Sequence, residues 1–149
     1  MAQTTLVLTR LLHAPIERVF AACSKPELFS RWLICCDNNS GTATATATNT
    51  LQVGGHYRVE MARDGQVFAR IDGEYLAIAA PHHLVFTWRS ENVSVQNSVV
   101  RIDLLDTGAG TTELRLSHAI DPDSHDGKRF TQGWTQALAN LLKLMEVIP

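Results

Sequence analysis

The sequence predicts an α+β protein in which a curved antiparallel sheet of about six or seven strands carries its helices on one face. Apolar residues recur at every second position in runs separated by turn signals, as expected of strands. Charges of both signs occupy the alternate positions, which is typical of a sheet with one solvated face. The C-terminal segment instead has apolar residues at helical spacing.

The chain begins with a predicted strand and two short helices. Residues 4–12 alternate in polarity and predict the first strand. Pro15 suits the first turn of a helix over residues 15–23. Ser24 and Glu27 fit the Ser-x-x-Glu capping box, so we expect Ser24 to cap a second helix that continues through Trp32.

A tract of alternating threonine and alanine follows a polar turn cluster at residues 37–41. Because threonine is β-branched and the period is two, residues 42–53 predict a strand with the alanines on one face. A mobile low-complexity loop is the alternative for Thr42 to Thr48. As an edge strand, this tract would offer unpaired backbone groups and little charge, which favours pairing with a second copy as a homodimer.

The middle of the chain predicts an antiparallel meander. Asp64-Gly65 is a favoured two-residue hairpin turn, Pro81 interrupts the pattern, and residues 108–110 form a further turn. The alternating runs between these signals lie at residues 57–61, 67–75, 84–88, 100–104 and 114–118.

One long amphipathic helix is predicted after Pro122, with Asp123 or Ser124 as its cap. Its polar positions fall on the side opposite to the apolar stripe, so the helix must pack across the sheet. The stripe consists of Phe130, Trp134, Leu138, Leu141 and Met145, and the polar side of Gln132, Gln136, Asn140 and Lys143.

Length and composition indicate a single domain over residues 1–149, with enough apolar residues for a full core. A formal charge of −2 provides no field that would attract nucleic acid or an acidic membrane. No apolar run is long enough to span a bilayer, and the N-terminus lacks the pattern of a signal peptide. The cysteines (Cys23, Cys35 and Cys36) have no disulfide or zinc spacing, so we expect reduced thiols and a cytoplasmic protein.

Seven short motifs recur in a fixed order along nearly the whole chain. They are Arg10 with Ala14-Pro15 and Val19-Phe20; Pro26-Glu27-Leu28 with Trp32; Val53-Gly54-Gly55-His56-Tyr57; Gly73-Glu74-Tyr75; Leu84-Val85-Phe86-Thr87-Trp88; Gly110-Thr111 with Leu114 and Leu116; and Gly133-Trp134. In this order they resemble the START-like (SRPBCC) superfamily and, within its polyketide-cyclase-like group, the branch named for activators of the heat-shock protein 90 ATPase. The resemblance implies a helix-grip fold, in which the sheet wraps around the long C-terminal helix.

Two features depart from that branch's pattern. Trp32-Leu33-Ile34 stands where paired tryptophans are usually followed by Gly-Pro, and the threonine–alanine tract has no counterpart. Both adjoin the expected mouth of the pocket, so the ligand preference of relatives does not transfer.

The resemblance also implies a deep, mostly apolar cavity between the sheet and the last helix. We expect aromatic side chains to form its walls, with Trp32 near the mouth. His118 is the one titratable group on the inner face of the last strand, where it would serve as the hydrogen-bond partner of a ligand or as a satisfied core histidine. The candidate ligand-binding residues are Trp32, Tyr57, Trp88, His118, Trp134 and Leu138.

The leading functional hypothesis is the binding of a small apolar or aromatic ligand. No firm catalytic residue, metal site or cofactor motif is present, and the adjacent His82 and His83 lack the spacing of a metal site. One alternative is an enzyme of the cyclase or hydrolase type, with His118 as acid or base. The other is a co-chaperone module that contacts a chaperone, which an exposed apolar patch would favour.

Overall fold

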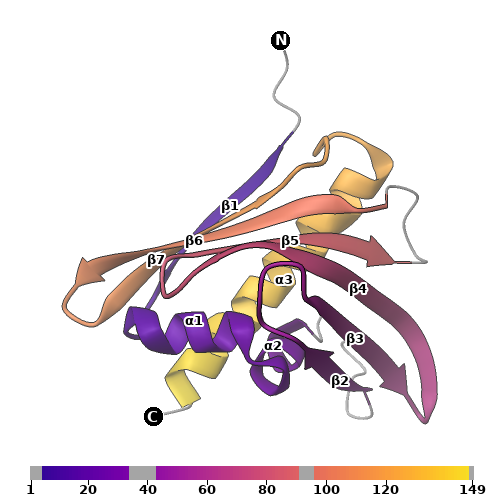
Figure 1. Ribbon diagram of the computed structural model, residues 1–149, viewed down its shortest axis with the longest axis horizontal. Helices are drawn as coiled ribbons and strands as arrows, with labels where there is room; N and C mark the ends of the chain where they lie inside the picture. The colour runs from indigo at the N-terminus through magenta and orange to yellow at the C-terminus, as the bar shows by residue number, and fades with distance from the viewer. Residues whose placement is uncertain (1–4, 34–42, 91–95, 148–149) are drawn as a thin grey trace.

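Seven antiparallel strands form one open sheet in the computed structural model, which describes residues 5–33, 43–90 and 96–147 (Figure 1). They are β1 (Leu6–Leu12), β2 (Ala43–Asn49), β3 (His56–Arg63), β4 (Gln66–Ala79), β5 (His83–Ser90), β6 (Ser98–Gly108) and β7 (Thr111–His118). Their order across the sheet is β1-β7-β6-β5-β4-β3-β2, so all strands except β1 lie beside their neighbours in the chain. The predicted meander is confirmed.

Three helices accompany the sheet in the described residues: α1 (Ile16–Ser24), α2 (Pro26–Leu33) and α3 (His125–Val147). Figure 1 shows α3, in yellow, crossing the strands diagonally, with α1 and α2 near its C-terminal half. Side chains join these helices, because Arg18 of α1 donates to the Met145 carbonyl at 3.1 Å and Asn140 of α3 donates to the Trp32 carbonyl at 3.3 Å. The α+β architecture with a long C-terminal helix is therefore as predicted.

The two predicted helix caps have different outcomes. Ser124 caps α3 as expected, because its Oγ accepts a hydrogen bond from the Gly127 amide at 2.9 Å. Ser24 does not cap α2. It is the last residue of α1, and its hydroxyl donates to the Phe20 carbonyl at 2.8 Å, which is common for serine in a helix. α2 begins at Pro26, so the residue that precedes the helix is Lys25, and Ser24 lies one position too early to cap it.

The threonine–alanine tract forms β2, an edge strand of the sheet, and so the strand interpretation is confirmed. Ala45 and Ala47 are half-buried against the core, whereas Thr44, Thr46 and Thr48 are exposed. The strand is shorter than the predicted 42–53, because the chain turns after Asn49, where the Gln52 amide donates to the Thr50 carbonyl and the Gly55 amide to the Gln52 carbonyl. Thr42 lies outside the described residues.

The hairpin turn at Asp64-Gly65 has the geometry that its sequence predicts. Both residues have positive φ angles, 53° at Asp64 and 80° at Gly65. Type I′ turns require this combination, and their twist matches that of the two strands they connect. The turn joins β3 to β4, whose inner-face residues Val59 and Ile71 lie opposite each other and are both buried.

The opposite face of the sheet is polar, as the alternating charges predict. Arg70 and Glu60 form an ion pair at 3.2 Å between β4 and β3, and Arg89 and Asp72 form one at 2.8 Å between β5 and β4. Exposed pairs of this kind contribute little stability, but they favour the register in which they form.

Two further sequence expectations concern membrane crossing and thiols. Among the described helices, none is both long and apolar enough to cross a bilayer. Cys23 is a free thiol in the core, and burial raises its pKa to about 12, so it packs as a small apolar side chain. Cys35 and Cys36 lie outside the described residues.

Candidate functional site

A pocket of about 170 Å³ lies between the inner face of the sheet and α3, and we refer to it as the apolar pocket. Its wall on the sheet side comes from β3, β4 and β5, the end of α2 closes one side, and α3 supplies the rest. The lining residues are Leu33, Met61, Ile71, Trp88, Arg129, Phe130, Gly133, Trp134 and Ala137. All but Arg129 are apolar or aromatic, as expected of a ligand pocket.

Helix α3 contributes to the apolar pocket through one continuous face. Phe130, Gly133, Trp134 and Ala137 follow the i, i+3, i+4, i+7 spacing that brings side chains together on a helix. Gly133 leaves a gap in this face, because a Cβ atom added to it would have no atom within 4 Å. A glycine in a helix interior costs about 0.5–1 kcal/mol relative to alanine. The sequence thus keeps space open at this position at some cost in stability.

Aromatic rings form one corner of the apolar pocket. The rings of Trp88 and Trp134 have their centroids 5.0 Å apart at an interplanar angle of 64°. Phe130 packs on Trp88 with a centroid distance of 6.0 Å at 85°. These edge-to-face contacts hold three large rings in fixed orientations, and they present a preformed apolar surface to a ligand.

A buried polar network lies behind this corner. The indole Nε1–H of Trp134 donates to Nδ1 of His118 at 3.1 Å. Because Nδ1 accepts, the imidazole proton resides on Nε2, which donates to the Ser98 hydroxyl oxygen at 2.7 Å. His118 has no exposed surface, and burial lowers its pKa from 6.5 to about 4. His118 is therefore a neutral side chain with both ring nitrogens engaged.

The candidate residues divide into two groups. Trp88 and Trp134 line the apolar pocket, whereas the other four are absent from its lining and lie in the core around it. Trp32 is fully buried rather than near the mouth, because its Nε1–H donates to the Ala22 carbonyl at 2.9 Å and holds the ring between α1 and α2. Leu138 is also fully buried, one residue beyond the lining residue Ala137.

Tyr57 lies in a different part of the core. Its hydroxyl donates to the Thr87 carbonyl at 2.6 Å, and burial raises its pKa well above the ordinary value. It borders a separate polar hollow of about 480 Å³ on the solvated face, together with Arg58 and Asp72. Its side chain is thus engaged by β5 rather than presented to the apolar pocket.

Several lining residues were not among the candidates. Phe130 and Ala137 share a helix face with Trp134, so helical spacing alone could have found them. Met61 and Ile71 occupy inward positions of their strands and were expected in the core only. Gly133 has no side chain, so no periodicity signals its role.

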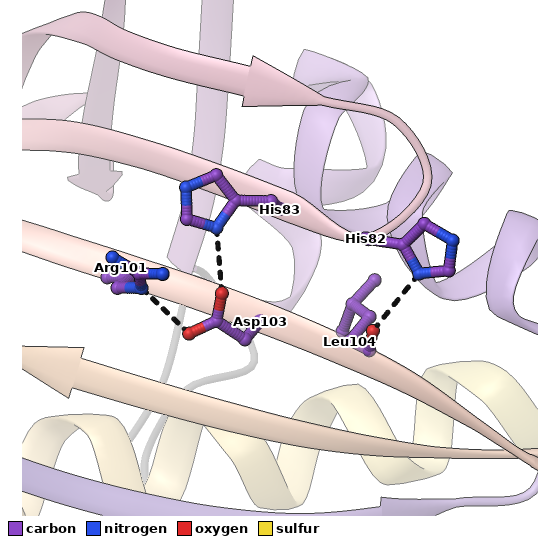
Figure 2. Close-up of polar contacts among 5 residues, drawn as sticks. All are labelled: His82, His83, Arg101, Asp103 and Leu104. Atoms are coloured by element: carbon purple, nitrogen blue, oxygen red, sulfur yellow. Dashed lines mark hydrogen bonds and ion pairs between the residues drawn. The ribbon is translucent and has the colours of Figure 1, made fainter.

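The paired histidines His82 and His83 are directed toward different partners on β6. Figure 2 shows His83 facing Asp103, at 2.7 Å from Nδ1 to Oδ1, while the ring of His82 turns to the Leu104 carbonyl at 3.4 Å. Arg101 donates to the second Asp103 oxygen at 2.9 Å. Partial burial alone would raise the pKa of Asp103, but the hydrogen bonds from His83 and Arg101 outweigh it and lower that pKa. Within the described ranges, no three His, Cys, Asp or Glu side chains are grouped to hold a metal ion.

Comparison with solved structures shows the same fold in other proteins. A protein of Chromobacterium violaceum is 25% identical, with 99% of this chain and 100% of that chain covered and a TM-score of 0.80. A protein of Rhodobacter sphaeroides is 20% identical over 99% of this chain and 96% of that chain, with a TM-score of 0.79. A protein of Nitrosomonas europaea is 22% identical over 98% and 96%, with a TM-score of 0.77.

Comparison with curated proteins finds no match. The family model described as "Activator of Hsp90 ATPase homolog 1-like protein" matches residues 13–146, which include α1, α2, strands β2 to β7 and nearly all of α3, but not β1. The sequence motifs, the seven-stranded sheet with its long C-terminal helix, and this match agree, and the chain belongs to the Activator of Hsp90 ATPase homolog 1-like family.

Proposed function

We propose that this protein binds a small apolar or aromatic molecule in the apolar pocket. Its fold and family support a ligand-binding domain in general. The observation that carries the proposal is Gly133, which lies in the interior of the long helix α3 at the pocket wall and leaves open space where any other residue would place a side chain. Selection for stability alone favours a larger residue at such a position.

The size of the apolar pocket indicates the size of the ligand. A dry apolar cavity of about 150 Å³ in another protein accommodates benzene. At about 170 Å³, the apolar pocket suits one aromatic ring with a short substituent. Phe130, Trp88 and Trp134 would contact such a ring on its faces and edges.

The enzymatic alternative receives less support from the geometry. It requires His118 to exchange a proton with a bound substrate, and general acid–base catalysis needs a heavy-atom distance of about 2.6–3.2 Å or one bridging water. Trp134 stands between His118 and the apolar pocket, and it occupies Nδ1. Ser98 occupies Nε2.

The co-chaperone alternative follows from the family's description and would require an exposed apolar docking surface. The large exposed apolar side chains among the described residues come from several elements, including Val7 and Leu11 on β1, Phe68 on β4 and Leu105 on β6. None of the four lines the apolar pocket. Ligand binding and chaperone contact would therefore use different parts of the molecule.

Binding of α-methylstyrene, a ring-sized hydrocarbon, tests the proposal. Isothermal titration calorimetry should detect one site on the wild-type protein and no site on Gly133→Leu, whose side chain would fill the apolar pocket. Gln136→Leu adds the same side chain on the exposed side of α3 and should bind like the wild type. The proposal fails if the wild type does not bind, or if Gly133→Leu binds as well as Gln136→Leu.

A further inference from the structure

Two tryptophans line the apolar pocket, and they differ in whether the indole N–H donates a hydrogen bond to another part of the protein. Trp134 donates its N–H to His118, as described above. Trp88 has no hydrogen-bond acceptor for its Nε1–H among the residues that the structure describes, and the residue as a whole is 7% exposed. Its Nε1 is not one of the fully buried atoms that lack a partner, so the N–H remains accessible. The third tryptophan of the chain, Trp32, donates to the Ala22 carbonyl. Of the three indoles, only that of Trp88 has an unused donor.

We propose that Trp88 Nε1–H is the specificity-determining donor of the apolar pocket, and that the ligand is a small aromatic molecule with one neutral oxygen acceptor, such as a ketone, aldehyde or ester. This inference rests on the proposed function and specifies the chemical class of its ligand. Native proteins pair nearly all buried donors with an acceptor. A ligand in the apolar pocket that covers the Trp88 N–H must therefore supply an acceptor or leave this donor unpaired.

The remaining polar groups in the lining leave this role to Trp88. Arg129 is exposed and already interacts with another group of the protein. The Trp134 N–H is held by His118, so this residue offers only its ring. The other lining side chains are hydrocarbon or thioether and donate no hydrogen bond.

The apolar lining of the pocket also indicates that the ligand's acceptor is uncharged. An ionised carboxylate placed among Met61, Ile71 and Phe130 would lose its hydration, and a single indole N–H would replace only one of its water contacts. A carbonyl oxygen loses less hydration, and one N–H donor satisfies most of its needs. The geometry therefore favours an aryl carbonyl compound over an aryl acid.

Acetophenone and α-methylstyrene form a matched pair of probes for this inference. They are similar in size and differ only in an oxygen atom that replaces a methylene group. In two-dimensional ¹H–¹⁵N spectra of the wild-type protein, acetophenone should shift the Trp88 indole proton downfield, and α-methylstyrene should not. The Trp134 and Trp32 indole signals should respond alike to both probes, because their N–H groups are already bonded.

The variant Trp88→Phe retains an aromatic wall but removes the donor. It should weaken acetophenone about three- to tenfold, the equivalent of one hydrogen bond, and change α-methylstyrene by less than about twofold. Equal losses for the two probes, or a Trp88 indole signal that responds equally to both, would overturn the inference while leaving the proposed function intact. If the wild type binds neither probe, the proposed function itself is overturned. The wild-type spectra decide the question even if Trp88→Phe does not fold.

Discussion

The indole N–H of Trp134 donates a 3.1 Å hydrogen bond to Nδ1 of His118, and this bond connects the wall of the apolar pocket to the sealed interior behind it. Trp134 lines the pocket, and His118 has no exposed surface. A proton on Nδ1 would place two donors against each other, so the bond exists only while His118 is neutral. The orientation of a pocket residue thus depends on the protonation state of a residue that a ligand does not reach.

Stability should decrease with acidity through His118. Burial lowers its folded-state pKa to about 4, whereas the unfolded chain has the ordinary value of 6.5. Between these values the unfolded state binds more protons, so the free energy of unfolding falls as the pH decreases from 6.5 to 4. Since a tenfold change in proton affinity corresponds to about 1.4 kcal/mol, the loss approaches ~3 kcal/mol.

Urea unfolding at a series of pH values measures this effect. His118→Leu should be less stable than the wild type at neutral pH, because it leaves the Trp134 N–H unpaired, but its stability should change much less between pH 6.5 and 4. If the two proteins lose stability in parallel over that interval, His118 is not the residue responsible.

Replacement of Trp134 should destabilise the fold far more than replacement of a residue on the other side of α3. Trp134 is 3% exposed and contacts Trp32, Trp88 and His118. Trp134→Ala should cost roughly 3–5 kcal/mol, whereas the exposed Gln136→Ala should remain within about 0.5 kcal/mol of the wild type. Equal denaturation midpoints for the two variants would contradict this account of α3.

Two glycines in α3 should respond in opposite directions to the same substitution. Gly133→Ala places a methyl group in open space and removes a helix-interior glycine, so it should stabilise the protein by about 0.5–1 kcal/mol. Gly127→Ala should destabilise it, because the added Cβ would collide with the Asp121 carbonyl oxygen. Thermal unfolding of both variants tests the contrast, and a stabilising Gly127→Ala or a destabilising Gly133→Ala would be inconsistent with it.

The sequence predicts the fold well because each element carries its own periodicity. The threonine–alanine tract is an example, since the alternation alone indicates a strand whose alanines share one face, and the structure shows that Ala45 and Ala47 pack against the core. The meander then follows from turns such as Asp64-Gly65, which allow chain neighbours to pair. Ser24 shows the limit of a local motif. Its hydroxyl, which the capping box would use, donates instead to the Phe20 carbonyl within α1.

The site was less predictable, because periodicity predicts which face of a strand or helix carries a side chain but not whether that side chain reaches the pocket. Trp134 and His118 both point inward, as the pattern indicates. Which of the two meets the pocket depends on how α3 crosses the sheet, and no local pattern contains that information. The open space at Gly133 likewise results from the distance between two layers.

The predicted homodimer would form through the open edge of strand β2. Thr50 donates its amide to the His56 carbonyl, so alternation in the antiparallel pair directs the backbone of Thr46 toward β3 and that of Ala45 toward the open edge. We expect wild-type protein to dimerise through this edge and Ala45→Pro to be monomeric with little loss of stability, since proline removes only an outward donor.

Thr46→Pro provides the comparison, because it removes a donor that bonds to β3 and should lower stability by at least about 1 kcal/mol. Light scattering at high micromolar concentration reports the association state of each protein. A monomeric wild type, or a dimer that survives Ala45→Pro unchanged, would rule out pairing through this edge.

The central claim is that the space beside Gly133 is a ligand site. A crystal soaked with bromobenzene, a probe of ring size, tests it directly through the anomalous signal of bromine. The account predicts one strong bromine peak within the apolar pocket, in contact with Trp88, Phe130 and Ala137, and no such peak in Gly133→Leu crystals. A wild-type pocket filled by the protein's own side chains, or bromine bound only elsewhere, would contradict the claim.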